Sequence, residues 1–384
     1  MRPPCVRWLA LALLPACTLT HSLDDLRGGI AAGGAASGSA GRGGNSGGGG
    51  DASVGGTEAG SGAGGTEPFD GPRVVSTSFV EEHETQGFLE EFQLQFNERM
   101  DASTLVGDAL CKGTVRLVKE DEKLCVPLGA VSAVEGQAGR YRVQPSEPLE
   151  VGARYDLTVT TDAKTSEGVA LATETTFSAT AVYRHGITID GTNDFLPGEK
   201  LATTTAGYAA YVAWDRAALY LGMSGAQIQE ADTSVFLLAY LGWPGAQTRT
   251  NVGQSYKAVT PQLSFDASHY ARWQGNNQGA TITQYTADMT WDEAMLGSVD
   301  GAFNRKDDFV ELRVPFEAFS APLPTPEAVV PFAMFLLRET AGAEDTFAAA
   351  PAVSMGSSTT PYLSKHYDFS PTESKTFPNQ YPVR

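Results

Sequence analysis

The sequence has little that points to catalysis or to a membrane-spanning segment. Its longest N-terminal apolar stretch, residues 8–14, is about half of the roughly 20 residues that a spanning helix requires. There are five histidines, and His83-Glu84 lacks the second histidine of a zinc-protease helix. The chain contains no Gly-x-Ser-x-Gly turn and no phosphate-binding glycine loop. These absences favour a non-catalytic protein, although a carboxylate pair for glycoside hydrolysis stays open in so acidic a chain.

The first residues of the chain have the composition of an export signal. Two arginines accompany the short apolar run, which ends at Leu14-Pro15-Ala16-Cys17. This segment resembles a bacterial lipobox, which implies cleavage before Cys17 and a diacylglycerol on its thiol. An ordinary signal with an incidental cysteine is the alternative. We expect a lipoprotein signal peptide over residues 1–16 and a protein that is anchored to a membrane without spanning it.

Residues 17–67 are expected to form a flexible tether. Between Gly28 and Gly65 the sequence is almost entirely Gly, Ala and Ser, which buries too little apolar surface to offset the entropy of ordering. Thr18 stands where many bacteria use aspartate to retain lipoproteins in the inner membrane, which favours the outer membrane. The net charge of −18 argues against nucleic acid and anionic lipid heads as ligands.

Only two cysteines, Cys111 and Cys125, follow the expected tether. Exported proteins reside in oxidising compartments, so these two cysteines are expected to form one disulfide. No histidine or further cysteine pair lies nearby in the sequence, so a zinc site is not expected there.

The remaining sequence predicts an all-β protein with two domains, residues 68–182 and 183–384. Short segments with alternating apolar residues recur, among them 92–96, 155–160, 208–214 and 309–314. In the last of these, Glu311 and Arg313 alternate with apolar residues, which is typical of a strand with one exposed face. Many short strands separated by Gly, Pro and Asp indicate sandwiches rather than α/β units.

The first domain carries residues typical of an Ig-like sandwich. In residues 149–159, Gly152 permits a turn and Tyr155 opens the next strand, where its hydroxyl would bond to the upstream backbone. Together with residues 72–78, 96–101 and 175–177, this run resembles the bacterial Ig-like domains first known from S-layer proteins. The resemblance implies an Ig-like β-sandwich that serves as a spacer or adhesive module, without catalysis.

An ordered set of short segments marks the second domain. Residues 187–191 read Ile-x-Ile-Asp-Gly, an aromatic strand ends at Trp214-Asp215, and Leu-Tyr-Leu-Gly and Val-Glu-Leu-x-Val-Pro follow at 219–222 and 310–315. This order resembles family 9 carbohydrate-binding modules and the related DOMON-type sandwiches. It implies a larger jelly-roll-like β-sandwich that often holds a sugar between aromatic rings, sometimes with structural calcium. We expect Trp214 in its core.

Aromatic rings beside amides are the candidate sugar site, because pyranose C–H faces pack on rings and sugar hydroxyls need polar partners. Trp243 and Trp273 lie in Gly-rich, loop-like surroundings, and Trp291 and Tyr270 are further candidates. The amides that follow Trp273 complete the expected set: Gln274, Asn276 and Asn277. For each tryptophan the alternative is ordinary packing in the core or in a loop.

Asp190, Asn193 and Asp194 could offer oxygens to a structural calcium ion. The alternative is that this Asp-Gly turn satisfies its own backbone. A haem or redox role of the DOMON type would need a ligand pair such as His269 with Met223 or Met289. No other cofactor is expected.

These patterns predict a non-catalytic envelope lipoprotein that binds a polysaccharide or other glycan through its second sandwich, with the first sandwich as a spacer. The alternative is a structural or adhesive envelope lipoprotein that binds a protein partner and has no sugar site. The first hypothesis predicts that Trp243 or Trp273 is exposed beside amides in a concave face. The second predicts a flat, polar face without an aromatic cleft.

Overall fold

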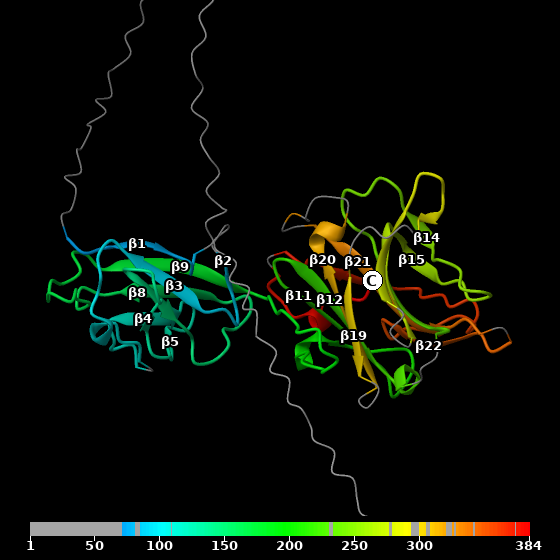
Figure 1. Cartoon of the computed structure of the whole chain (residues 1–384), viewed down its shortest axis with the longest axis horizontal. Coiled ribbons are helices and arrows are strands. Elements are labelled where there is room, and N and C mark those ends of the chain that lie inside the picture. Colours follow the sequence, from blue (N-terminus) through cyan, green and yellow to red (C-terminus); the bar gives the residue numbers. More distant parts are fainter. Residues whose placement is uncertain are drawn as a thin grey trace, which may run out of the picture. The chain divides into compact units, whose positions relative to one another are not determined.

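The computed structural model describes residues 71–80, 85–108, 110–229, 233–275, 279–292, 299–304, 308–319, 325, 328–340, 342–372 and 374–384 (Figure 1). Within these ranges the regular elements are strands and short 3-10 helices, so the chain is all-β, as the sequence predicts. No helix in this part of the chain is long and apolar enough to cross a membrane. The expected signal peptide, Cys17 and the tether lie outside the described residues.

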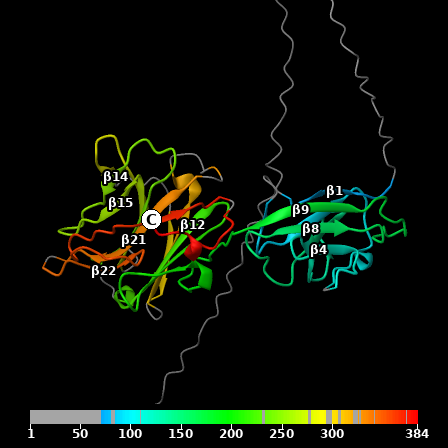
Figure 2. The same cartoon turned by 180° about the vertical axis from the view of Figure 1, so that it is seen from behind.

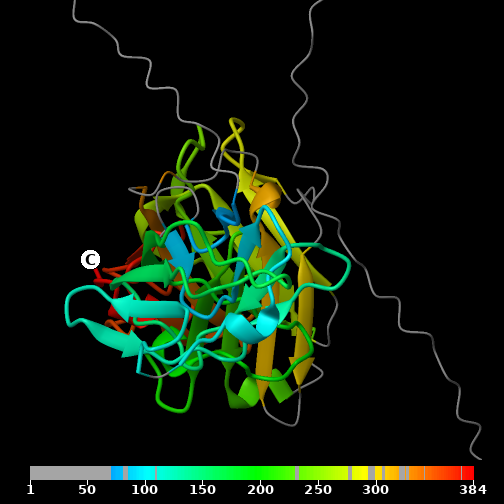
Figure 3. The same cartoon turned by 90° about the vertical axis from the view of Figure 1, so that its left-hand side faces the viewer.

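The first sandwich consists of a four-stranded and a five-stranded sheet (Figure 3, where this sandwich faces the viewer in blue to green). The four-stranded sheet has the order β1 (Val74–Thr77), β3 (Phe92–Phe96), β7 (Arg140–Val143) and β6 (Ser132–Ala133). The five-stranded sheet has the order β2 (Thr85–Gly87), β9 (Thr175–Val182), β8 (Arg154–Val159), β4 (Val115–Lys119) and β5 (Leu124–Val126).

Strand alternation forms the core of the first sandwich. In β3 every second residue is buried, beginning with Phe92, whereas Gln93 and Gln95 are partly exposed. The strand β8 follows the same pattern from Tyr155 onward. Because successive side chains on a strand point to opposite faces, each of these strands contributes one face to the core and leaves the other to solvent.

The Tyr155 corner forms as the sequence predicts. The ring is buried, with 3% of its surface exposed, and the hydroxyl oxygen accepts the backbone N–H of Glu150 at 2.8 Å. This contact fixes the turn that leads into β8, because it gives a partner to a backbone donor that would otherwise lie unpaired beside the core.

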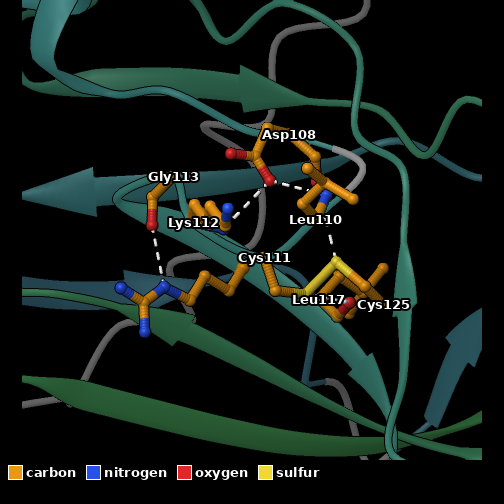
Figure 4. The surroundings of a disulfide bond; sticks show 8 residues. Asp108, Leu110, Cys111, Lys112, Gly113, Leu117 and Cys125 are labelled. Atoms are coloured by element: carbon orange, nitrogen blue, oxygen red, sulfur yellow. Dashed lines mark hydrogen bonds between the residues drawn. A yellow bond between two sulfur atoms is a disulfide. The ribbon is translucent and has the colours of Figure 1, made fainter.

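The expected disulfide between Cys111 and Cys125 is present, with the Cα atoms 5.7 Å apart (Figure 4). The Asp108 carboxylate organises the loop before it, since Oδ1 accepts the backbone N–H groups of Leu110 and Lys112 at 2.7 and 3.0 Å. Cys125 lies in β5, so the bond ties this loop to a strand at the edge of the five-stranded sheet.

The second sandwich contains two large sheets. The first has the order β10 (Lys200–Leu201), β11 (Ala209–Trp214), β12 (Ala218–Ser224), β20 (Phe309–Pro315) and β19 (Asp300–Asn304). The second has the order β18 (Trp291–Asp292), β17 (Gly279–Tyr285), β16 (His269–Gln274), β13 (Val235–Leu241), β21 (Val330–Arg338) and β22 (Asp345–Ala350), with β23 (Tyr367–Phe369) also paired to β21.

An additional layer covers the outer face of the second of these sheets. All seven residues of β13 are buried. One set, which includes Leu237, faces the main core with Trp214, and the other set, which includes Tyr240, belongs to a separate apolar cluster. That cluster contains Leu263 and Phe265 of β15 (Gln262–Ala267), which pairs with β14 (Thr250–Val252) (Figure 2, where both strands are labelled). The β14–β15 pair is therefore a third layer on the sandwich.

The strand β20 corrects one expectation from the sequence. Glu311 was expected on an exposed face, but its side chain is fully buried. Its Oε1 accepts the backbone N–H groups of Asp190 and Gly191 at 2.7 and 2.5 Å, so the turn after the first segment of this domain covers the carboxylate. Burial raises the pKa of Glu311 to about 7, against the opposing effect of these two N–H groups.

Candidate functional site

Trp243 and Trp273 lie in the core and not in an exposed site. Neither ring has any exposed surface. The Trp243 ring stacks on Phe319, with ring centroids 3.9 Å apart and ring planes at 4°. Trp273 belongs to β16 and, like Ala271 two residues earlier, points into the main core. The expectation that either ring is free to stack on a sugar is wrong, because strand alternation places Trp273 inward and Phe319 covers Trp243.

The amide predicted beside these rings is engaged by the backbone. Gln274 ends β16, and its Nε2 donates to the carbonyl oxygen of Thr233 at 2.7 Å. Asn276 and Asn277 lie outside the described residues. Tyr270 is fully buried and packs edge-on against Trp291, at a centroid distance of 5.0 Å.

Trp291 borders a groove of about 490 Å³ on the covered side of the second large sheet. One wall is the segment that runs from β14 to Ser255, and the other is the hairpin that joins β17 to β18. The apolar and aromatic lining consists of Val252, Tyr285, Met289 and Trp291. The polar lining consists of Thr250, Gln254, Ser255 and Thr290, and Gly253 completes the wall.

Three tyrosines hold the Trp291 ring in place. Tyr270, Tyr285 and Tyr240 contact it edge-on, with ring centroids 5.0, 5.2 and 5.8 Å away. The indole Nε1 donates to the carbonyl oxygen of Val252 at 3.1 Å, which joins the two walls of the groove. Because the ring is fixed before any ligand arrives, little side-chain entropy remains to be lost on binding.

Tyr240 also positions the β14 wall. Its hydroxyl accepts the backbone N–H of Gln254 at 3.0 Å, and complete burial raises its pKa well above the usual value. The ring approaches the backbone so closely that a Cβ on Gly253 would lie 2.6 Å from the Tyr240 hydroxyl. Glycine at position 253 is therefore required for the wall to rest on the sheet.

The other wall ends in an exposed turn. The backbone N–H of Thr286 donates to Thr290 O at 2.9 Å, and that of Met289 donates to Thr286 O at 3.1 Å. Met289 is 80% exposed at the tip, beside the groove. The groove thus offers aromatic and thioether surface together with hydroxyl and amide groups, which suits the binding of a polar molecule with apolar faces.

The predicted calcium residues engage their own loop. Asp190 Oδ1 accepts the N–H of Thr192 at 2.7 Å, and Asn193 Oδ1 that of Phe195 at 3.3 Å. Asp194 Oδ2 accepts the N–H of Thr188 at 3.2 Å. This is the geometry of the alternative interpretation, a turn that satisfies its own backbone. In the described ranges, no three His, Cys, Asp or Glu side chains are arranged to hold a metal ion.

The residues considered for a haem role lie in different environments, which do not suit a shared axial site. His269 is fully buried against Phe319, with Nδ1 2.9 Å from the Ser268 hydroxyl, and burial lowers its pKa to about 4. Met223 is buried in the main core, whereas Met289 is exposed on the hairpin tip.

A second polar cluster, which the sequence did not indicate, joins Ser264, His366 and Asp368. The Ser264 hydroxyl lies 3.0 Å from His366 Nδ1, and His366 Nε2 lies 3.3 Å from Asp368 Oδ1. Arg384 Nε contacts the other carboxylate oxygen at 3.1 Å. Burial lowers the pKa of His366. The order of groups is that of a hydrolase relay, but the groove around Trp291 is not lined by any of them, and the arrangement fastens the closing segment to β15.

Sequence reasoning named Trp291 but missed the rest of the groove. Tyr285, Met289, Gln254 and Ser255 were not identified as candidates. Five residues, 286–290, separate the aromatic residues Tyr285 and Trp291, and this short, mostly polar break is a recognisable hairpin signal. The opposite wall comes from nearly forty residues upstream, and no local pattern connects the two.

Comparison with known proteins gives distant structural likenesses only. No family model matches the sequence, and no curated protein matches it. The N-terminal part of the bacterial S-layer protein SbsC matches with a TM-score of 0.24 and 13% identity, over 58% of this chain and 42% of that one. The rSbsC(31-844) structure matches with a TM-score of 0.24 and 8% identity, over 79% and 58% of the two chains.

The structure of SbsC domains 1-6 gives the same TM-score of 0.24, with 9% identity over 78% of this chain and 57% of that one. This chain therefore spans about half of the length of the S-layer structures that it matches. At such identities and TM-scores the likeness carries no argument about activity, and the description of the fold rests on the strands themselves.

Proposed function

We propose that this protein is a non-catalytic lipoprotein of the cell envelope that binds carbohydrate in the groove around Trp291, with the first sandwich as a spacer. The observation that carries the binding part is a preformed groove of about 490 Å³ that combines a fixed tryptophan with hydroxyl and amide side chains. This volume lies within the usual range of small-ligand sites, about 300 to 1,000 Å³.

The chemistry of the lining supports a sugar ligand. A pyranose presents flat C–H faces, which pack on aromatic rings, and equatorial hydroxyls, which need hydrogen-bond partners. Trp291 and Tyr285 supply the rings. Gln254 and Ser255 supply an amide and a hydroxyl on the opposite wall. The sugar site of this proposal therefore keeps Trp291 and drops Trp243 and Trp273, whose rings are enclosed by protein.

The anchoring part of the proposal rests on the N-terminal sequence. Cys17 would carry the lipid and residues 18–67 would hold the folded part away from the membrane, which we place at the outer membrane. The full-length protein with Cys17 should incorporate labelled palmitate and sediment with membranes. Cys17→Ser should do neither, and equal labelling of both proteins would contradict the proposal.

A glycan-array screen tests the binding part. The soluble protein of residues 66–384, which form one compact unit, should bind at least one glycan saturably. Trp291→Ala and Gln254→Ala should weaken this binding about tenfold or more, because each removes a direct contact. Tyr362→Ala is the matched control, since Tyr362 is an aromatic residue with 48% of its surface exposed that does not line the groove.

A blank array with cooperatively folded protein would overturn carbohydrate binding. The same groove would then be a candidate contact for an envelope protein partner, in a structural or adhesive lipoprotein. Equal loss of binding in Trp291→Ala and Tyr362→Ala would place the sugar elsewhere on the sandwich.

A further inference from the structure

The backbone at Met289 carries strain that a glycine at this position of the turn would avoid. Its φ is +59°, in the left-handed region, where a side chain beyond Cβ is disfavoured and glycine or asparagine is usual. The position closes the turn between β17 and β18, where the left-handed residue of a short hairpin loop is most often glycine. A long apolar side chain at this position therefore costs stability.

Packing does not offset that cost. Met289 is 80% exposed, so its thioether chain contributes almost nothing to either core cluster. Strained non-glycine residues cluster at ligand contacts and active sites. The Met289 side chain lines the edge of the Trp291 groove, so the strained backbone places this side chain where a ligand in the groove would contact it.

The groove is also electrically neutral along its described lining. None of the side chains that line it carries a charge at neutral pH, and the polar ones are hydroxyls and one amide. The charged residues nearest along the chain lie outside this lining and are of both signs: Asp288 and Asp292 beside one wall, and Arg249 and Lys257 beside the other. A charged ligand would lose part of its hydration in the groove and would find no side chain of opposite charge among the lining residues.

We infer that the groove takes an uncharged glycan, one ring of which packs on the Met289 side chain beside Trp291. This inference rests on the proposed function, since it specifies the ligand of the same groove. An unbranched thioether adapts its shape to an irregular C–H face, and the hydroxyls and amide of the lining match neutral sugar hydroxyls. Uronic acids and sulfated sugars should bind more weakly, because their charges would lose hydration without gaining a charged partner in the lining.

The experiment compares Met289→Gly with Lys123→Gly in the soluble protein of residues 66–384. Lys123 also has a left-handed backbone, with φ +53°, in the turn between β4 and β5 of the first sandwich. Both changes relieve the same kind of strain, so each should raise the Tm of its own sandwich by about 2 to 4 °C. Only Met289→Gly should weaken binding of a neutral glucan or mannan, by about fivefold or more.

The probes are a neutral β-glucan, a neutral mannan and a polygalacturonate of similar length, measured by calorimetry. Binding of a neutral polymer that falls in Met289→Gly and persists in Lys123→Gly supports the inference. Neutral binding that is unchanged in Met289→Gly overturns the role of Met289, and equal or tighter binding of polygalacturonate overturns the charge selectivity. Binding of none of a full glycan array overturns the proposed function itself, which is a distinct result.

Discussion

The two sandwiches differ in how many of their faces are covered. In the first, β3 and β8 bury alternate residues and leave the other face partly exposed. In the second, β11, β12 and β13 are buried along almost their whole length, because apolar clusters lie on both faces. The layer that covers the outer face of β13 also provides a wall of the Trp291 groove. The groove therefore occurs where a third layer covers a sheet incompletely.

The largest expected effect concerns Trp243, and it tests whether this ring is buried in the core of the second sandwich. Trp243→Ala should lower the free energy of unfolding by about 3 to 5 kcal/mol, because it leaves a cavity against Phe319. Urea unfolding followed by circular dichroism measures the change. The exposed Tyr362→Ala is the control and should cost far less. An equally small loss of unfolding free energy in Trp243→Ala would contradict the burial of this ring and make it a candidate sugar contact again.

The disulfide should stabilise the first sandwich alone. Replacing Cys111 and Cys125 together by serine should cost about 3 kcal/mol, through the entropy of the opened loop. All tryptophans beyond the N-terminal one lie in the second sandwich, so their fluorescence reports only that part. The fluorescence transition should stay in place while the transition seen by circular dichroism broadens or moves to lower temperature. A joint shift of both signals would show that the two sandwiches unfold as one unit.

Glu311 should make the second sandwich sensitive to pH. Burial raises its pKa from 4.5 in the reference state to about 7 in the folded protein, so the folded state favours the protonated acid. Its contribution to stability is then fully present below pH 4.5 and is lost as the pH rises through about 7, with a total of up to about 3 kcal/mol.

Glu311→Gln keeps the acceptor for the Asp190 and Gly191 N–H groups and removes the titration. Urea unfolding at pH 4.5 and 7.5 should therefore show a larger fall for the wild type than for this variant. Glu317→Gln, at an exposed position three residues after Val314, should behave like the wild type. Parallel pH profiles in all three proteins would refute the assignment.

The smallest effect concerns the Tyr155 corner. Tyr155→Phe removes the acceptor for the Glu150 N–H while keeping the buried ring, so it should cost about 1 kcal/mol of unfolding free energy. Thermal unfolding by circular dichroism measures this loss. Tyr362→Phe, which changes an exposed hydroxyl, should be neutral. A neutral Tyr155→Phe would mean that water replaces the tyrosine at the Glu150 amide.

Features encoded by neighbouring residues could be predicted from the sequence. The alternation in β3 and β8, the hydroxyl contact of Tyr155 and the Cys111–Cys125 bond all join residues that are close along the chain. The all-β character follows from the same local signals, repeated many times.

Features that depend on distant partners could not be predicted. Glu311 reads as an exposed position because its partners, the Asp190 and Gly191 amides, come about 120 residues earlier. Trp243 resembles a loop residue until Phe319 covers it. The groove joins Trp291 to Val252, 39 residues away, and only the folded sheet brings these two segments together. Aromatic residues beside amides in the sequence therefore indicate a possible sugar site, but they do not show which ring remains accessible in the folded protein.

The hydrogen bond from Gln254 to the Tyr240 hydroxyl separates two tasks within a few residues. On one side of this hydrogen bond, Tyr240 belongs to the apolar cluster that covers β13. On the other side, Gln254 and Ser255 line the groove. Side chains that line the groove can therefore be substituted while Tyr240 holds the backbone of the β14 wall against the sheet. The lining of the groove can thus be diversified, by selection or in a library, at positions 254, 255, 289 and 290 with little cost to folding.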